Sequence, residues 1–259
     1  FMAVPTIYSK LISTWEESPP EQQQFWSKAC SKIRLMVSGS AALPIQTLKK
    51  WKRISGHFLL ERYGMTEIGM ALSNPLEGKR VPGYVGLPLP GVKVRLVNEN
   101  GHVVEPGIPG EIQVKGPNVF SEYWQRPKET KKSFQQGWFK TGDIGFWCSK
   151  DTKDQGDVDS LKITGRKDSM FISGGENIHP EEIERILLQF GQTEQALVVA
   201  VQDSEFGARP VAFLKTGEDF TESKLQKFLE KRLTKFKVPD LFLALPELVE
   251  SEIKHNRVE

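Results

Sequence analysis

The sequence has little of what marks a secreted, membrane-spanning or nucleic-acid-binding protein. Only two of its 259 residues are cysteines, too few and too far apart for a disulfide framework or a metal cluster. No apolar run is long enough to span a bilayer, so we expect no integral membrane contact. The 35 basic and 33 acidic residues give a net charge of +2, which argues against a nucleic-acid partner. We therefore expect a protein of a reducing compartment, the cytoplasm or an organelle matrix, and find no indication of its oligomeric state.

The short motifs that most often mark nucleotide, hydrolase or metalloprotease sites are absent as well. No G-x-G-x-x-G, G-x-x-x-x-G-K-[ST], G-x-S-x-G or H-E-x-x-H pattern occurs. The four histidines are scattered and have no spacing typical of a metal site or a catalytic triad. The composition, with 38% hydrophobic and 26% charged residues, is that of a globular protein whose length allows two domains.

The first third of the chain has the pattern of a parallel α/β sheet. Proline positions and apolar spacing predict helices at 5–18, at 20–31 and from Pro44, with short strands at 33–37 and 58–63. Strand, helix and strand joined by short links form the βαβ pattern of a parallel sheet. We therefore predict that this part, residues 1–80, is the end of a doubly wound α/β subdomain.

The rest of the chain is expected to form two further parts. Between residues 81 and 164, glycine and proline recur among short β-rich runs, which indicates an antiparallel, β-barrel-like subdomain. A polar insert at 148–160 is expected to be an exposed loop. The large domain is predicted to cover 1–166, and a small mobile α+β lid domain 167–259. The lid's expected elements are strands at 196–201 and 210–215 and helices at 180–190 and 221–233, the last capped by Thr221.

Four polar motifs each allow a purely structural explanation. "YGMTE" places Thr66 beside Glu67, which suits a helix N-cap and first turn, or else an oxygen cluster that binds phosphate or metal. "GWFKTGD" is consistent with a simple Thr-Gly-Asp turn ending at Asp143. "ITGRKD" suits a surface ion pair between Arg166 and Asp168, and "GGENIHPEEIE" a loop before a helix. Each explanation is adequate alone, but none accounts for the four motifs occurring together in this order.

In that order, the four motifs resemble those of the AMP-forming adenylating superfamily of acyl-CoA synthetases, peptide-synthetase adenylation domains and luciferases. The resemblance covers essentially the whole chain. It implies a large domain that binds ATP and a small carboxylic acid and forms an acyl-adenylate with release of pyrophosphate. It also implies a small domain that then rotates, so that a thiol attacks the adenylate. ATP, Mg²⁺ and coenzyme A are the implied cofactors and co-substrates.

The resemblance also implies roles for individual residues at the nucleotide. Tyr63 is expected to stack on adenine, with Gly64 beside the nucleotide. Thr66 would hydrogen-bond the α-phosphate, and Glu67 would hold Mg²⁺, a hard cation that prefers oxygen ligands. Asp143 is expected to accept hydrogen bonds from the ribose hydroxyls, because a carboxylate accepts two at once.

Further residues are implied at the pocket, the hinge and the thiol channel. Arg166 is expected to donate to the same ribose or its phosphate, and Asp168 to be the hinge on which the small domain turns. Gly174 and Gly175 would line the channel for the pantetheine arm. Small residues that leave room along the nucleotide and acyl pocket are expected at Gly39, Ser40 and Ala41.

Two features depart from the family's pattern. Lys254 aligns with the catalytic lysine of the adenylation step, but it follows Ile253, where many members have glycine. The family's Ser/Thr/Gly-rich phosphate loop, which ends in a lysine, does not occur in the 259 residues. We therefore expect the loop to lie in an N-terminal part of a longer polypeptide. By itself, the 259-residue chain is expected to have little ATP-dependent activity.

The sequence gives mixed signals about the acid. The stretch from Leu59 through "GLPLPGV" resembles malonyl-CoA synthetases, whereas "ISGGENIHPEEIER" and "EIKHNR" resemble o-succinylbenzoate–CoA ligase of menaquinone synthesis. Both families activate dicarboxylic acids, and Arg62 is a candidate anchor for a second carboxylate, with a structural ion pair as the alternative. We predict a short or dicarboxylic, malonate-like acid. An o-succinylbenzoate–CoA ligase and a non-catalytic nucleotide-binding or scaffold protein are the alternatives.

Overall fold

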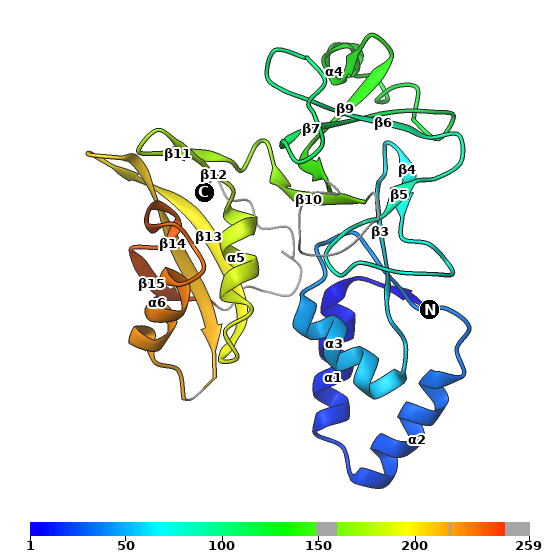
Figure 1. Ribbon diagram of the computed structural model, residues 1–259, viewed down its shortest axis with the longest axis vertical. Coiled ribbons are helices and arrows are strands. Elements are labelled where there is room, and N and C mark those ends of the chain that lie inside the picture. Colours follow the sequence, from blue (N-terminus) through cyan, green and yellow to red (C-terminus); the bar gives the residue numbers. More distant parts are fainter. Residues whose placement is uncertain (149–159, 218, 247–259) are drawn as a thin grey trace. The chain divides into compact units, whose positions relative to one another are not determined.

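A computed structural model describes residues 1–148, 160–217 and 219–246, and its elements are labelled in Figure 1. The chain divides into two compact units, Phe1–Ile163 and Thr164–Glu259, which we describe separately. The predicted domain boundary after residue 166 lies three residues beyond this division. In the described part of the chain, no helix has both the length and the apolar character needed to cross a membrane.

The first unit begins with a parallel α/β segment, as predicted. Its strands β1, β2 and β3 pair in parallel in that order, and helix α3 connects β2 to β3. The bounds are β1 Met2–Ala3, α1 Pro5–Glu16, α2 Pro20–Ser31, β2 Val37–Ser38, α3 Ile45–Ser55 and β3 Leu60–Met65. Proline is the first residue of both α1 and α2, where its missing N–H costs no helical hydrogen bond.

Two strand predictions in this segment were wrong in extent. The strand expected at 33–37 is reduced to Val37–Ser38, because Ile33 still donates its N–H to Cys30 O (3.0 Å) in the turn that ends α2. The strand expected at 58–63 begins later, at Leu60, and continues to Met65. Helix α3 also begins one residue after Pro44, which is its N-cap residue.

A compact apolar cluster holds the helices of this segment against its strands. Tyr8 on α1 and Trp51 on α3 are buried, and their rings meet edge to face at 5.2 Å. The Tyr8 hydroxyl donates to Val37 O (2.9 Å), which satisfies its polar group inside the core. Packed aromatic side chains therefore support the parallel strands next to which candidate site residues lie.

The remainder of the first unit consists largely of antiparallel strand pairs, as predicted, but they begin at β4, before the predicted start at residue 81. β3 continues into β4 (Gly69–Ser73), which pairs with β5 (Leu87–Pro88). A second sheet has the order β10-β9-β7-β6, with β8 paired to β9. Its elements are β6 Lys93–Val97, β7 Gly110–Lys115, α4 Pro127–Ser133, β8 Phe134–Gln135, β9 Trp138–Trp147 and β10 Leu161–Arg166, whose last three residues belong to the second unit. Most of the polar insert predicted at 148–160 lies outside the described residues.

The second unit is a small α+β module, as predicted. Strand β13 pairs antiparallel with β14, which pairs in parallel with β15. The elements are β11 Phe171–Ser173, β12 Glu176–Ile178, α5 Pro180–Leu187, β13 Thr193–Asp203, β14 Gly207–Thr216, α6 Glu222–Glu230, a 3-10 helix Lys235–Lys237 and β15 Leu241–Ala244. Buried side chains of α5 and α6 pack on this sheet. Thr221 is the N-cap residue of α6, but its side chain makes no capping hydrogen bond, so the predicted cap was wrong in that respect.

Candidate nucleotide and metal site

Thr66 and Glu67 lie in the tight turn between β3 and β4, not in a helix. The turn is closed by a hydrogen bond from Ile68 N to Met65 O (3.1 Å). The explanation of this pair as a helix N-cap and first turn is therefore wrong, because an antiparallel strand follows directly. Thr66 is exposed and Glu67 is half-buried, so both side chains stand at the accessible tip of a hairpin.

Gly64 allows the two strands of this hairpin to approach closely. The β3–β4 register shifts between Tyr63 and Gly64, and a β-carbon on Gly64 would lie 2.0 Å from the carbonyl oxygen of Gly69. No side chain fits at that distance, so the backbone geometry alone requires glycine here. The role of Gly64 beside the nucleotide stays a prediction.

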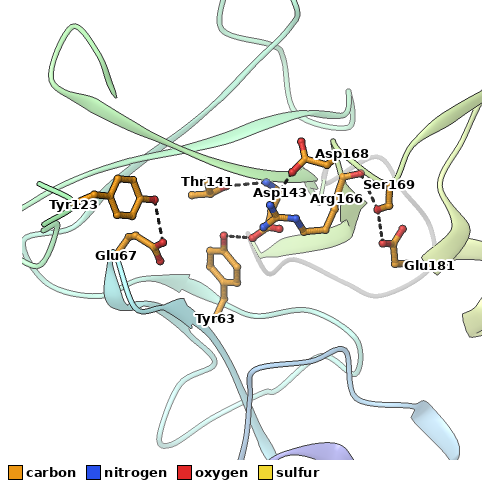
Figure 2. A network of polar contacts seen from close by, with 9 residues as sticks. All are labelled: Tyr63, Glu67, Tyr123, Thr141, Asp143, Arg166, Asp168, Ser169 and Glu181. Carbon is orange, nitrogen blue, oxygen red and sulfur yellow. Dashed lines mark hydrogen bonds and ion pairs between the residues drawn. The ribbon is translucent and has the colours of Figure 1, made fainter. Parts of the chain in front are cut away.

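The segment 118–123, between β7 and α4, makes three hydrogen bonds to this turn. Tyr123 Oη donates to Glu67 Oε1 at 3.0 Å, and Figure 2 shows the two side chains facing each other. Phe120 N donates to Glu67 O (2.8 Å), and Asn118 Nδ2 donates to Ile68 O (2.6 Å). Tyr123 was not predicted from the sequence, because 56 residues separate it from Glu67 and no motif links the two.

Asp143 lies in the middle of strand β9, so the explanation of "TGD" as a simple turn is wrong. Between the pairs Gln113↔Lys140 and Glu111↔Ile144, three residues of β9 oppose one residue of β7. The Thr141 hydroxyl occupies this irregularity: it donates to Ile112 O (2.8 Å) and accepts from Asp143 N (3.0 Å). Such irregularities are over-represented near functional sites.

Tyr63 and Asp143 are joined directly by their side chains. The Tyr63 hydroxyl donates to Asp143 Oδ2 at 2.5 Å, and each residue is only 8% exposed. Figure 2 shows the phenol pointing at the carboxylate. The Tyr63 ring also packs in the apolar cluster of the second sheet. The structure therefore assigns Tyr63 a contact that the sequence did not predict, and stacking on adenine stays a prediction.

The small-residue segment after β2 lies beside Arg62. A β-carbon on Gly39 would lie 3.2 Å from Arg62 Cγ and 3.4 Å from Arg62 Nε, so glycine leaves room for the arginine side chain. Ser40 has a left-handed backbone (φ +67°), and both Ser40 and Ala41 are exposed. Arg62 Nε is buried and has no hydrogen-bond partner, and the same holds for the hydroxyl of Ser38 at the end of β2.

In the second unit, Arg166 and Asp168 form an ion pair. Arg166 Nη2 lies 3.1 Å from Asp168 Oδ2, and the two side chains are 44% and 79% exposed. This matches the structural explanation of "ITGRKD", and such an exposed pair contributes little to stability. Nearby, the Ser169 hydroxyl donates to Glu181 Oε1 (2.8 Å), which ties the same segment to the start of α5. The nucleotide role of Arg166 and the hinge role of Asp168 stay predictions.

Gly174 and Gly175 form the two-residue turn between β11 and β12. Both have positive φ (+58° and +87°), which is the conformation of a type I′ hairpin turn and strongly favours glycine. Strand β12 lies between this turn and α5, and His179, the N-cap residue of α5, makes no side-chain capping bond, so the expectation of a simple loop before a helix was wrong. The role of the two glycines in a pantetheine channel stays a prediction. The remaining predicted site residue, Lys254, lies outside the described residues.

Comparison with known proteins decides the family. Residues 1–124 match the AMP-binding enzyme family, and residues 182–252 match its C-terminal domain. The chain belongs to the AMP-binding enzyme family. The mitochondrial malonate–CoA ligase ACSF3 of Bos taurus is 42% identical over 285 residues, covering 98% of this chain and 46% of that protein. The resemblance read from the four motifs is thus confirmed.

Solved structures of AMP-binding enzymes share the fold. ATP-bound MatB of Rhodopseudomonas palustris has a TM-score of 0.83 at 36% identity, covering 96% of this chain and 47% of that one. The o-succinylbenzoate CoA synthetase MenE of Bacillus subtilis, in complex with the acyl-adenylate intermediate OSB-AMP, has a TM-score of 0.76 at 29% identity, covering 99% and 51%. The predicted fold class is confirmed, and the chain spans about half the length of these relatives.

Glu67 is a donor of the type that Mg²⁺ uses beside substrate phosphates. Among residues 1–148, 160–217 and 219–246, no three His, Cys, Asp or Glu side chains gather into a metal cluster. Mg²⁺ is usually bound by one or two carboxylates together with substrate phosphates and water, and it does not need an all-protein cage. A single half-buried carboxylate such as Glu67 suits that type of site.

Proposed function

We propose that the full-length protein is an ATP-dependent acid–thiol ligase that acts on malonate or a similar dicarboxylic acid. One carboxylate oxygen of the acid attacks the α-phosphorus of ATP, and pyrophosphate leaves. The thiol of coenzyme A then attacks the acyl carbon, and AMP leaves. The family of the chain and the 42% identity to a malonate–CoA ligase support the ligase reaction.

Arg62 is the observation that favours a dicarboxylic acid. Its Nε is buried without a hydrogen-bond partner, and among the described residues its side chain forms no ion pair, so the alternative of a structural ion pair is not supported. Buried polar atoms are nearly always paired in folded proteins, which makes an orphan donor an indication of a missing ligand. A guanidinium is always charged and binds carboxylates in two-point geometry. We assign it to the carboxylate of the acid that does not react.

The location of Arg62 agrees with this assignment. It lies on β3 beside Gly39, at the carboxyl end of the parallel strands, where open α/β sheets usually bind ligands. Gly39, Ser40 and Ala41 are assigned to the acid pocket, where their small side chains would add almost no bulk. The orphan Ser38 hydroxyl at the end of β2 supplies a second unused polar group nearby in the sheet.

The nucleotide roles follow the resemblance, with one addition from the geometry. Asp143 is assigned to the ribose hydroxyls, and the Tyr63 hydroxyl orients its carboxylate. Thr66 is assigned to the α-phosphate and Glu67 to Mg²⁺, both at the exposed tip of the β3–β4 hairpin. When bound, the ion would neutralise charge on the phosphates.

Substrate selectivity of an Arg62 variant tests the dicarboxylic assignment. In the full-length protein, Arg62→Gln should lower kcat/KM for malonate by at least about 30-fold, because removing one partner of a buried charge pair costs about 2–5 kcal/mol. Propionate and butyrate, which lack the second carboxylate, should be used no worse than by the wild type. Arg53→Gln, on the exposed face of α3, is the matched control and should leave both values unchanged.

Two results would contradict the assignment. Equal loss of kcat/KM for malonate and for the monocarboxylic acids would make Arg62 a general structural residue. Full malonate activity in Arg62→Gln would remove it from the acid site altogether. A wild-type preference for o-succinylbenzoate over malonate would instead support the alternative of an o-succinylbenzoate–CoA ligase and contradict the proposal that malonate is the substrate.

A further inference from the structure

We propose that Tyr123 is a positioning residue: its hydroxyl holds the Glu67 carboxylate in the orientation that binds the nucleotide-bound cation. The inference rests on the proposed role of Glu67. It adds a residue to that site to which no motif of the sequence assigns a function.

The first observation is that Glu67 needs an external partner to be fixed. It stands at the tip of a hairpin, half-buried, on a side chain with three rotatable torsions. Ordering such a side chain costs rotamer entropy. The bond from Tyr123 Oη to Glu67 Oε1 (3.0 Å) removes part of that freedom before any ligand arrives.

The second observation is that the bond leaves the carboxylate able to bind a cation. A carboxylate has two oxygens with about four acceptor positions in total. Tyr123 uses one position on Oε1, and the described residues place no other side chain on either oxygen of Glu67. Oε2 and the remaining lone pairs stay available. A hydroxyl donor is also neutral, so it orients the carboxylate without neutralising the charge that attracts the cation.

The third observation is that Tyr123 is itself held in place independently of Glu67. Its ring packs edge to face on Phe120 with a centroid separation of 4.7 Å, and its backbone N donates to Thr130 Oγ1 (3.0 Å). Phe120 in turn contacts Phe134 and Phe139, whose ring is buried. The phenol is therefore anchored to the aromatic core of the second sheet.

The fourth observation is that the same segment also fixes the backbone of the turn. Phe120 N donates to Glu67 O (2.8 Å), and Asn118 Nδ2 donates to Ile68 O (2.6 Å). One segment thus hydrogen-bonds both to the main chain of the turn and to the side chain of Glu67. Metal-binding carboxylates generally depend on such outer partners, and their loss typically lowers metal affinity or activity 10- to 100-fold.

The test removes only the hydroxyl, in the full-length protein. Tyr123→Phe should raise the Mg²⁺ concentration that half-saturates pyrophosphate release by about tenfold. At saturating Mg²⁺, the KM for the acid should stay within about twofold of the wild type. Mn²⁺ binding in the presence of a non-hydrolysable ATP analogue, followed by electron paramagnetic resonance, should weaken by the same factor. Trp124→Phe, a neighbouring residue that is 82% exposed, is the matched control and should change neither quantity.

Glu67→Gln and the double variant separate this inference from the function on which it rests. Glu67→Gln should weaken Mn²⁺ binding at least as much as Tyr123→Phe, and the double variant should be no worse than Glu67→Gln alone. If Tyr123→Phe binds Mn²⁺ like the wild type while Glu67→Gln does not, the positioning role is refuted and the Glu67 assignment stands. If Glu67→Gln also binds Mn²⁺ normally, both are refuted. A general loss of melting temperature and acid affinity in Tyr123→Phe, with unchanged metal affinity, would make Tyr123 merely structural.

Discussion

Removing the Tyr63 hydroxyl tests whether the Asp143 carboxylate is held by the bond that the structure shows. The bond is 2.5 Å long, and both partners are 8% exposed, so water cannot readily replace the lost donor. Hydrogen bonds to charged groups contribute about 1.5–3 kcal/mol, against about 1 kcal/mol for neutral pairs. We therefore expect Tyr63→Phe to lower the free energy of unfolding of the first unit by about 1.5–3 kcal/mol.

A matched control is available in the same unit. Tyr8→Phe also deletes a buried tyrosine hydroxyl, but its acceptor is the neutral carbonyl of Val37, so we expect a loss of only about 1 kcal/mol. Chemical denaturation of the single variants, and of each combined with Asp143→Ala, gives the coupling energies. Tyr63 and Asp143 should be coupled by at least about 1.5 kcal/mol, whereas Tyr8 and Asp143, in different clusters, should be additive. A coupling below about 0.5 kcal/mol between Tyr63 and Asp143 would refute the reasoning.

The remaining predictions concern a close contact and a buried titratable group. Gly64→Ala should lower the melting temperature markedly, since its β-carbon would lie 2.0 Å from a backbone oxygen, whereas Gly191→Ala, with nothing within 4 Å, should not. Burial, the largest effect, lowers the pKa of His179, while Glu181 and Glu182 oppose that shift. At a pH below the ordinary histidine pKa, His179 is therefore protonated more readily in the unfolded chain than in the folded chain. The free energy of unfolding should then fall as the pH falls. Between pH 7 and 5, chemical denaturation should show a smaller decrease in the free energy of unfolding for His179→Gln than for the wild type. Equal decreases in the two proteins would contradict this prediction.

The fold was largely predictable because its local signals agree with its tertiary structure. Proline at the start of α1, α2 and α5, and the apolar spacing of these helices, placed them to within a few residues. Strand ends were less predictable, because pairing with a neighbour decides them. Helix α4, seven residues long and without buried side chains, gave no periodic signal and was missed.

The site was predictable where a motif carries it and not where the fold assembles it. The order of short motifs points to Thr66, Glu67 and Asp143 as candidates, and their roles stay predictions. The bond between Tyr63 and Asp143 spans 80 residues of sequence, and that between Glu67 and Tyr123 spans 56. Neither pair has a spacing rule, because tertiary packing brings its members together: Tyr63 and Asp143 lie on strands of two different sheets, and Glu67 and Tyr123 lie in a turn and a loop. The same limit explains why "TGD" was read as a turn: only its register against β7 shows the bulge.

Acid-dependent pyrophosphate release by the full-length protein tests the central claim most directly. With Mg²⁺ and ATP, malonate should stimulate release strongly, o-succinylbenzoate and monocarboxylic acids much less, and coenzyme A should then convert the adenylate to the thioester. Mass spectrometry of the products would identify malonyl-AMP and malonyl-CoA. Release that is independent of any acid, or absent across dicarboxylic and fatty acids alike, would contradict the account and favour a non-catalytic nucleotide-binding protein.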